Sequence, residues 1–140
     1  MNFIIESEQE LGDVIWMQLS ARLKAGFRCA LVGDLGAGKT TLVKRIAKKL
    51  KIKDHITSPT FNLRKEYIID DNLFLQHIDL YRHESKVADN AEILEWVNDQ
   101  SAITFVEWPE RAFEDLSIFD LVVRINQIDK SKREVSLLWN

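Results

Sequence analysis

The chain has 140 residues, 46% apolar and 29% charged, which is the composition of an ordinary soluble domain with one core. Its formal net charge is −3, which argues against a general nucleic-acid binder, and so against a DNA-binding protein, because that function needs a dominant positive field. No apolar run approaches the roughly 18–20 residues that span a membrane, and the N-terminal segment lacks the features of a signal peptide. The single cysteine, Cys29, lies in an apolar run and fits a core position. These features predict a cytoplasmic protein with no membrane association.

Apolar periodicity and turn signals predict one α/β domain over residues 1–140. A capping box at Ser7 to Glu10 begins a helix whose apolar residues recur every four positions toward Gly26. The turn residues 70–72 and 129–131 each join two strand-like runs, which predicts two hairpins. The expected strands are 3–5, 27–32, 61–69, 73–80, 102–106, 118–128 and 133–139, and the later helices are 40–50, 88–99 and 109–116. We expect a mixed sheet, with parallel strands near its centre and antiparallel hairpins beside them.

Residues 33–40, Gly-Asp-Leu-Gly-Ala-Gly-Lys-Thr, match the Walker A pattern of a phosphate-binding loop, or P-loop. An apolar strand-like run precedes them and an amphipathic helix follows. A P-loop needs this setting: glycines admit the phosphates to the backbone amides, and the helix N-terminus adds partial positive charge. Lys39 is expected to bridge the β- and γ-phosphates, and the Thr40 hydroxyl to bind Mg²⁺. The other expected nucleotide-binding residues of the loop are Gly33, Leu35, Gly36, Ala37, Gly38 and Thr41. The pattern therefore predicts a P-loop NTPase-like fold.

Hydrolysis also needs a carboxylate near the metal and a group that positions water. Glu107 directly follows the apolar run 103–106, which is the Walker B pattern, and ligands of α/β sheets bind at the carboxyl ends of strands. On a strand, Asp79 would share one face with His77 and Tyr81. We therefore expect Asp79 and Glu107 to be catalytic together with the P-loop lysine. The pattern alone also allows Asp79 to be part of an ordinary polar edge.

The nucleotide base is expected to be adenine. Guanine-binding proteins commonly carry Asn-Lys-x-Asp, and the nearest segment here, residues 126–129, lacks the lysine. Residues 79–82, Asp-Leu-Tyr-Arg, also lack the glycine of the GTPase Asp-x-x-Gly switch. These differences favour ATP as the ligand.

The motifs together resemble the bacterial TsaE family, also called YjeE, of tRNA threonylcarbamoyladenosine biosynthesis ATPases. The matching segments lie in the same order between about residues 3 and 125: residues 33–41, Ser58-Pro59-Thr60-Phe61, His77-Ile78-Asp79-Leu80-Tyr81-Arg82 and Val106-Glu107-Trp108-Pro109-Glu110. The resemblance implies a compact P-loop fold and a weak ATPase that works with the TsaB–TsaD pair. That pair transfers threonylcarbamoyl to the tRNA adenosine beside the anticodon, so contact with tRNA would be indirect.

The resemblance also implies roles for single residues. Thr40 and Glu107 would be the metal ligands, and Asp79 would be needed for hydrolysis. Thr60 would lie in a switch-like loop at the nucleotide, and Trp108 close to the nucleotide. Glu10, on the N-terminal helix, is a candidate for holding the base.

Two other functions stay open from the residues alone. Small P-loop kinases share this loop, so a small-molecule phosphotransferase is one alternative. A multi-arginine lid is not evident, however, because Arg82 and Arg111 are the only arginines between Arg64 and Arg124. The other alternative is a nucleotide-dependent binding module without turnover, which a hydrolysis assay with and without partners would identify.

Overall fold

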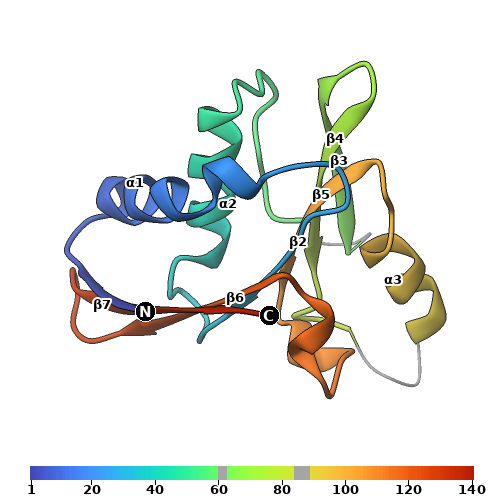
Figure 1. The fold of residues 1–140 in the computed structure, drawn as a ribbon. Helices are drawn as coiled ribbons and strands as arrows, with labels where there is room; N and C mark the ends of the chain where they lie inside the picture. The colour runs from blue at the N-terminus through green and yellow to red at the C-terminus, as the bar shows by residue number, and fades with distance from the viewer. Residues whose placement is uncertain (60–62, 84–88) are drawn as a thin grey trace.

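The computed structural model describes residues 1–59, 63–83 and 89–140, and these residues form an α/β fold around one mixed sheet (Figure 1). The strands are β1 (Asn2–Ile5), β2 (Arg28–Val32), β3 (Arg64–Asp70), β4 (Leu73–Asp79), β5 (Ala102–Glu107), β6 (Leu121–Gln127) and β7 (Arg133–Trp139). The helices are α1 (Glu8–Leu19), α2 (Lys39–Lys49) and α3 (Asn90–Val97), with 3₁₀ turns η1 (Ser20–Arg22), η2 (Pro109–Arg111) and η3 (Leu116–Ile118). None of the helices in this part of the chain is long and apolar enough to cross a membrane.

The strand order across the sheet is β1-β7-β6-β2-β5-β4-β3. The central strand β2 pairs in parallel with β5 and β6, and β4 pairs in parallel with β5. The outer pairs β3/β4, β6/β7 and β1/β7 are antiparallel. The expected mixed sheet and both expected hairpins are confirmed.

Helices cover both faces of the sheet, with α1 and α2 on one side and α3 on the other (Figure 1). Side-chain alternation along the strands produces these two layers. On β2, Cys29 and Leu31 pack in the core beneath α1 and α2, while Ala30 packs in the core beneath α3. Cys29 is fully buried, and this burial raises the pKa of its thiol, so the residue belongs to the core as expected.

Local signals explain how the first helix begins. The hydroxyl of Ser7 accepts a hydrogen bond from the backbone N–H of Glu10 at 3.0 Å, and the Glu10 carboxylate accepts one from the N–H of Glu6 at 2.9 Å. This reciprocal capping box satisfies backbone donors that the first helical turn leaves open. The bond engages one oxygen of the Glu10 carboxylate, and the contact of Glu10 with a nucleotide base stays a prediction.

The structure corrects one predicted helix. Residues 109–116 were expected to form a short helix because Pro109 suits a first helical turn. They instead contain the 3₁₀ turn η2, an irregular segment and the start of η3. The side chain of Asp115 caps η3 by accepting a hydrogen bond from the N–H of Ser117 at 2.9 Å. A local side-chain bond of this kind competes with a continuous helix.

Candidate nucleotide site

The predicted P-loop connects the end of β2 to the start of α2, and its glycines are required by the backbone. Gly36 has φ 81° and Gly38 has φ 116°, conformations that other residues adopt with strain. A Cβ on Gly33 would lie only 2.5 Å from the carbonyl oxygen of Ile125, whereas a Cβ on Gly36 would meet nothing within 4 Å. Gly36 therefore lies at the open side of the loop, and Gly33 lies close against the backbone of β6.

Lys39 begins α2, and its side chain folds back over the loop, only 4% exposed. Its Nζ donates hydrogen bonds to the carbonyl oxygens of Gly33 and Asp34. Burial lowers the pKa of Lys39 below its ordinary value, while nearby carboxylates, that of Glu107 foremost, raise it. The loop thus holds a desolvated cation, whose charge an anionic ligand would stabilise.

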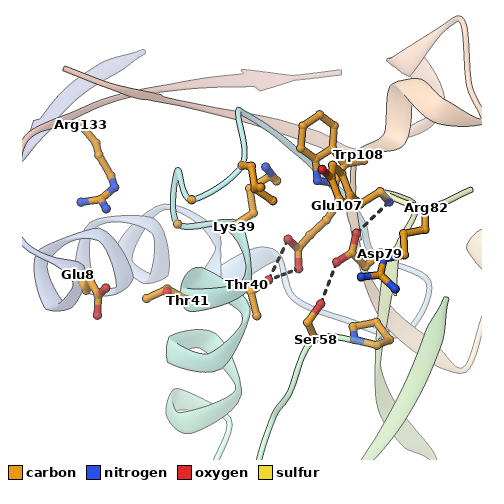
Figure 2. A pocket seen from close by; sticks show the side chains of 15 residues that line it. Glu8, Lys39, Thr40, Thr41, Ser58, Asp79, Arg82, Glu107, Trp108 and Arg133 are labelled. Carbon is orange, nitrogen blue, oxygen red and sulfur yellow. Dashed lines mark hydrogen bonds between the residues drawn. The ribbon is translucent and has the colours of Figure 1, made fainter. Parts of the chain in front are cut away.

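Glu107 connects the P-loop helix to the end of β5. The hydroxyl of Thr40 lies 2.9 Å from Oε1 and 2.8 Å from Oε2 of Glu107 (Figure 2). The Glu107 side chain is almost fully buried, and its Oε2 lies 2.5 Å from Nε2 of His77. Two residues that are 67 positions apart in the chain therefore meet where a P-loop protein would bind its metal ion.

Asp79 ends β4 and lies opposite Glu107 in the parallel ladder between β4 and β5. Its Oδ2 accepts a hydrogen bond from the Ser58 hydroxyl at 2.9 Å, and its Oδ1 accepts one from the N–H of Tyr81 at 3.0 Å. Asp79 and His77 share a strand face, as the alternation predicts. Tyr81 lies beyond the end of the strand and reaches the same pocket from the following turn.

These side chains line a pocket of about 440 Å³ at the carboxyl ends of the parallel strands. Of the predicted residues, it is lined by Leu35, Gly36, Gly38, Lys39, Thr40, Thr41, Asp79, Glu107 and Trp108. Gly33 and Ala37 do not line it: the Gly33 carbonyl accepts a hydrogen bond from Lys39, and Ala37 is buried in the core. Thr60 lies outside the described residues.

Comparison with known proteins identifies the family of this chain. The family model described as "Threonylcarbamoyl adenosine biosynthesis protein TsaE" matches residues 5–135. The chain belongs to the TsaE family. It is 36% identical to a relative from Aquifex aeolicus, named tRNA threonylcarbamoyladenosine biosynthesis protein TsaE, over 96% of this chain and 92% of that protein. A protein of the same name from Bacillus subtilis is 37% identical over 84% of this chain and 72% of its own length.

A solved structure extends the likeness to three dimensions. The crystal structure of YdiB from Bacillus subtilis has a TM-score of 0.73 and 29% sequence identity, and the match covers 98% of this chain and 83% of that one. The α/β fold with a mixed sheet is therefore shared with YdiB. The resemblance to the TsaE family that the motifs indicate is confirmed by these matches.

In this TsaE-family chain, Trp108 adopts an unusual backbone conformation next to the P-loop. Its φ is 56°, in the left-handed region that a bulky side chain rarely occupies. The indole lies 4.2 Å from Nζ of Lys39 and 5.1 Å, between ring centroids, from Tyr81. Backbone strain of this kind concentrates at functional sites. The turn after β5 thereby places an aromatic ring over the P-loop lysine.

The donor groups of the pocket suit Mg²⁺ in the presence of a nucleotide. Within residues 1–59, 63–83 and 89–140, no three His, Cys, Asp or Glu side chains are grouped to hold a metal by themselves. Mg²⁺ commonly uses one or two protein oxygens, with phosphates and water completing its octahedron. Thr40 and Glu107 offer such hard oxygen ligands beside the phosphate loop.

Six pocket residues were not among the predicted site residues: Glu8, Ser58, Pro59, Tyr81, Arg82 and Arg133. Ser58 and Arg82 belong to the motifs that resemble the family, so a sequence signal for them existed. Glu8 and Arg133 carry no motif, and they come from the first and last thirds of the chain. Long-range pairing of β1 with β7 brings their segments to the P-loop.

Proposed function

We propose that this TsaE-family chain is a weak, Mg²⁺-dependent ATPase that supports the TsaB–TsaD pair in threonylcarbamoyl modification of the tRNA adenosine beside the anticodon. The observation that carries the proposal is the contact between Thr40 and Glu107, which joins the phosphate loop to a buried carboxylate. A phosphate-binding turn without this partner would bind anions but lack a metal-positioning group.

Each group of the pocket would have a distinct task. Lys39 and the loop amides would bind the phosphates, and the α2 N-terminus would add its partial charge. Mg²⁺, when bound, would neutralise phosphate charge, and the residues that would hold it are Thr40 and Glu107. Asp79, whose two carboxylate oxygens are fixed by Ser58 and the N–H of Tyr81, would orient the attacking water. Its fixed orientation matters because phosphoryl transfer depends mainly on positioning and charge.

Family membership supports a proposal for the partners and the setting of this chain. The relatives bear the name tRNA threonylcarbamoyladenosine biosynthesis protein, and we propose the same pathway for this chain. In this proposal the chain acts in the cytoplasm, contacts tRNA only through the TsaB–TsaD complex, and binds ATP. A pull-down from cell extract with ATP present would test the partners: recovery of TsaB and TsaD is expected, and their absence would contradict this part of the proposal.

The central test is Mg²⁺-dependent phosphate release by Glu107→Gln and Glu107→Ala. Both variants should bind nucleotide and lose hydrolysis, because the carboxylate that would hold the metal is gone. Glu110→Gln is the matched control, since Glu110 is an exposed acid on the adjacent turn and is expected to leave hydrolysis unchanged. Parental hydrolysis in both Glu107 variants would overturn the assignment.

The same assay separates the alternative functions. Phosphate release in water without an acceptor favours an ATPase over a small-molecule phosphotransferase. No release, either alone or with TsaB and TsaD, would indicate a binding module without turnover. The comparison therefore needs the purified chain with and without its proposed partners.

A further inference from the structure

The turns that follow β4 and β5 carry an aromatic pair in the wall of the pocket. These two strands end side by side, and the N–H of Leu80 donates to the carbonyl oxygen of Glu107 at 3.0 Å, which joins the two turns. Tyr81 and Trp108 follow directly, with their ring centroids 5.1 Å apart and an angle of 44° between the ring planes. Both residues line the pocket, and Tyr81 is 39% exposed. The pair therefore lies where the pocket meets solvent.

Arg111 packs on both rings. Its Cζ lies 5.4 Å from the ring centroid of Trp108 and 5.7 Å from that of Tyr81, within the range of a cation–π contact. The turn η2 produces this contact locally. The N–H of Arg111 donates to the carbonyl oxygen of Trp108 at 3.0 Å, and side chains three positions apart on a 3₁₀ turn lie in line with each other. Arg111 is not one of the described residues that line the pocket, so it would act on a ligand through the two rings.

The Trp108 indole thus contacts two cations. Figure 2 shows the Trp108 side chain beside that of Lys39, whose Nζ lies 4.2 Å from the ring centroid. The same Nζ donates to the carbonyl oxygens of Gly33 and Asp34. The phosphates of a nucleotide would compete with these carbonyls and with the ring for Lys39, because bonds between opposite charges are the stronger ones. Arg111 is therefore the cation that can keep hold of the indole once Lys39 binds phosphate.

The backbone of Trp108 depends on such support. Its φ of 56° and ψ of 47° lie in the left-handed region, which costs free energy for a residue with a bulky side chain. A conformation of this kind persists only where its surroundings hold it. Contact with the Arg111 cation and packing against the Tyr81 ring both favour it. Removal of either contact should let the indole turn away from the P-loop.

We propose that Arg111 is a positioning residue for the nucleotide pocket: together with Tyr81, it holds the Trp108 indole over the P-loop lysine, so that the ring shields the phosphates from water. The proposal rests on the proposed function, because the shielded group is the phosphate end of a bound nucleotide. Exclusion of water strengthens the attraction between Lys39 and the phosphates, since their charges then interact across a lower dielectric. Loss of the Arg111 cation would therefore lower the affinity for nucleotide.

The first measurement reads the position of the indole and needs no nucleotide. Acrylamide quenching of tryptophan fluorescence is compared in the parent and in Arg111→Leu, and both are repeated with Trp108→Phe to subtract the other three tryptophans. The Trp108 component should be quenched more strongly in Arg111→Leu. Arg111→Lys should restore the parental value, because an ammonium also attracts an aromatic face. Arg124→Leu is the matched control, because Arg124 is an exposed arginine that lines a different cavity.

The second measurement reads the consequence for the ligand. Calorimetry with Mg²⁺ should show ADP binding about two- to fivefold weaker in Arg111→Leu, as expected for the loss of one exposed cation–π contact. The same substitution made in Trp108→Leu should have no further effect, because the ring on which Arg111 acts is already absent. Arg111→Lys should regain most of the affinity, and Arg124→Leu should match the parent.

Three results would overturn this inference. Parental quenching of Trp108 in Arg111→Leu would mean that Arg111 does not hold the indole. Parental ADP affinity in Arg111→Leu would mean that the held ring does not help to retain the nucleotide. An equal loss of affinity with and without the Trp108 ring would mean that Arg111 acts by another route. A parent chain that does not bind ADP at all would instead contradict the proposed function, and the quenching would still report whether Arg111 holds the ring.

Discussion

Nε2 of His77 lies 2.5 Å from Oε2 of Glu107, and the structure buries both side chains on one face of adjacent parallel strands. The Thr40 hydroxyl approaches the same carboxylate from α2. Among the described residues, Nδ1 of His77 has no hydrogen-bond partner, so the ring bonds only through the nitrogen that faces Glu107. His77 therefore positions Glu107 toward the P-loop.

His77→Leu should weaken divalent-metal binding and hydrolysis about tenfold, because a bond to a charged group is lost and Glu107 can rotate. His77→Gln should restore much of both, since its side-chain amide can donate to the same oxygen. Mn²⁺ binding in the presence of ADP, measured by paramagnetic resonance, reads the metal site independently of turnover. If His77→Leu melts at a lower temperature but keeps the Mn²⁺ affinity of the parent, His77 stabilises the fold and does not position the metal ligand.

Asp79→Asn should keep ADP affinity nearly unchanged and lower hydrolysis at least about tenfold, or ~1.4 kcal/mol of transition-state stabilisation. The amide can still bond to Ser58 and to the N–H of Tyr81, so the fold should survive while the negative charge is removed. Phosphate release and melting temperature are measured on one preparation. Preserved hydrolysis per folded molecule with a lower melting temperature would assign Asp79 to stability alone.

The free energy of unfolding of the nucleotide-free protein should depend on pH, because the Lys39 cation is buried. Its pKa in the folded chain is lowered from 10.5, so the unfolded chain binds more protons in the interval just below that value. Stability of the parent should therefore rise with pH through this interval, relative to Lys39→Met, which has no charge to lose. Urea unfolding of both proteins between neutral pH and 10.5 gives the difference. A difference that stays constant would show that folding does not disfavour the Lys39 cation.

Trp108 should report nucleotide binding through its fluorescence, because its ring lies 4.2 Å from the lysine that would meet the phosphates. Trp16, Trp96 and Trp139 do not line the pocket and should contribute a constant background. The signal that ADP produces in the parent should therefore disappear in Trp108→Phe, which retains an aromatic ring. Titration of both proteins with ADP makes the comparison, and an unchanged signal in the variant would contradict the expected location.

The P-loop and the strand that ends at Glu107 could be predicted because their signals are local. Eight consecutive residues specify the loop, since positive φ at Gly36 and Gly38 and the lysine at a helix start are needed within that span. The strand 102–106 and its terminal acid are likewise a short continuous run. Alternation on β4 also places Asp79 and His77 on one face, a relation of two residues along one strand.

Short-range patterns failed where a local bond or a distant strand decided the outcome. Residues 109–116 were expected to form one helix, but the Asp115 side chain caps a separate 3₁₀ turn that begins at residue 116. Glu8 and Arg133 were not among the predicted site residues, and the pairing of β1 with β7 helps to bring their distant segments to one pocket.

The amino-acid sequence by itself determined the family, the phosphate loop and the acids at the strand ends, because each depends on spacing within a few residues. The tertiary structure alone decided which side chains share the pocket. It set Glu107 between Thr40 and His77 and brought Arg133 to the carbonyl of Ala37. These contacts depend on strand order and register across the sheet, which arise from burying apolar faces over the whole chain and leave no local pattern to read.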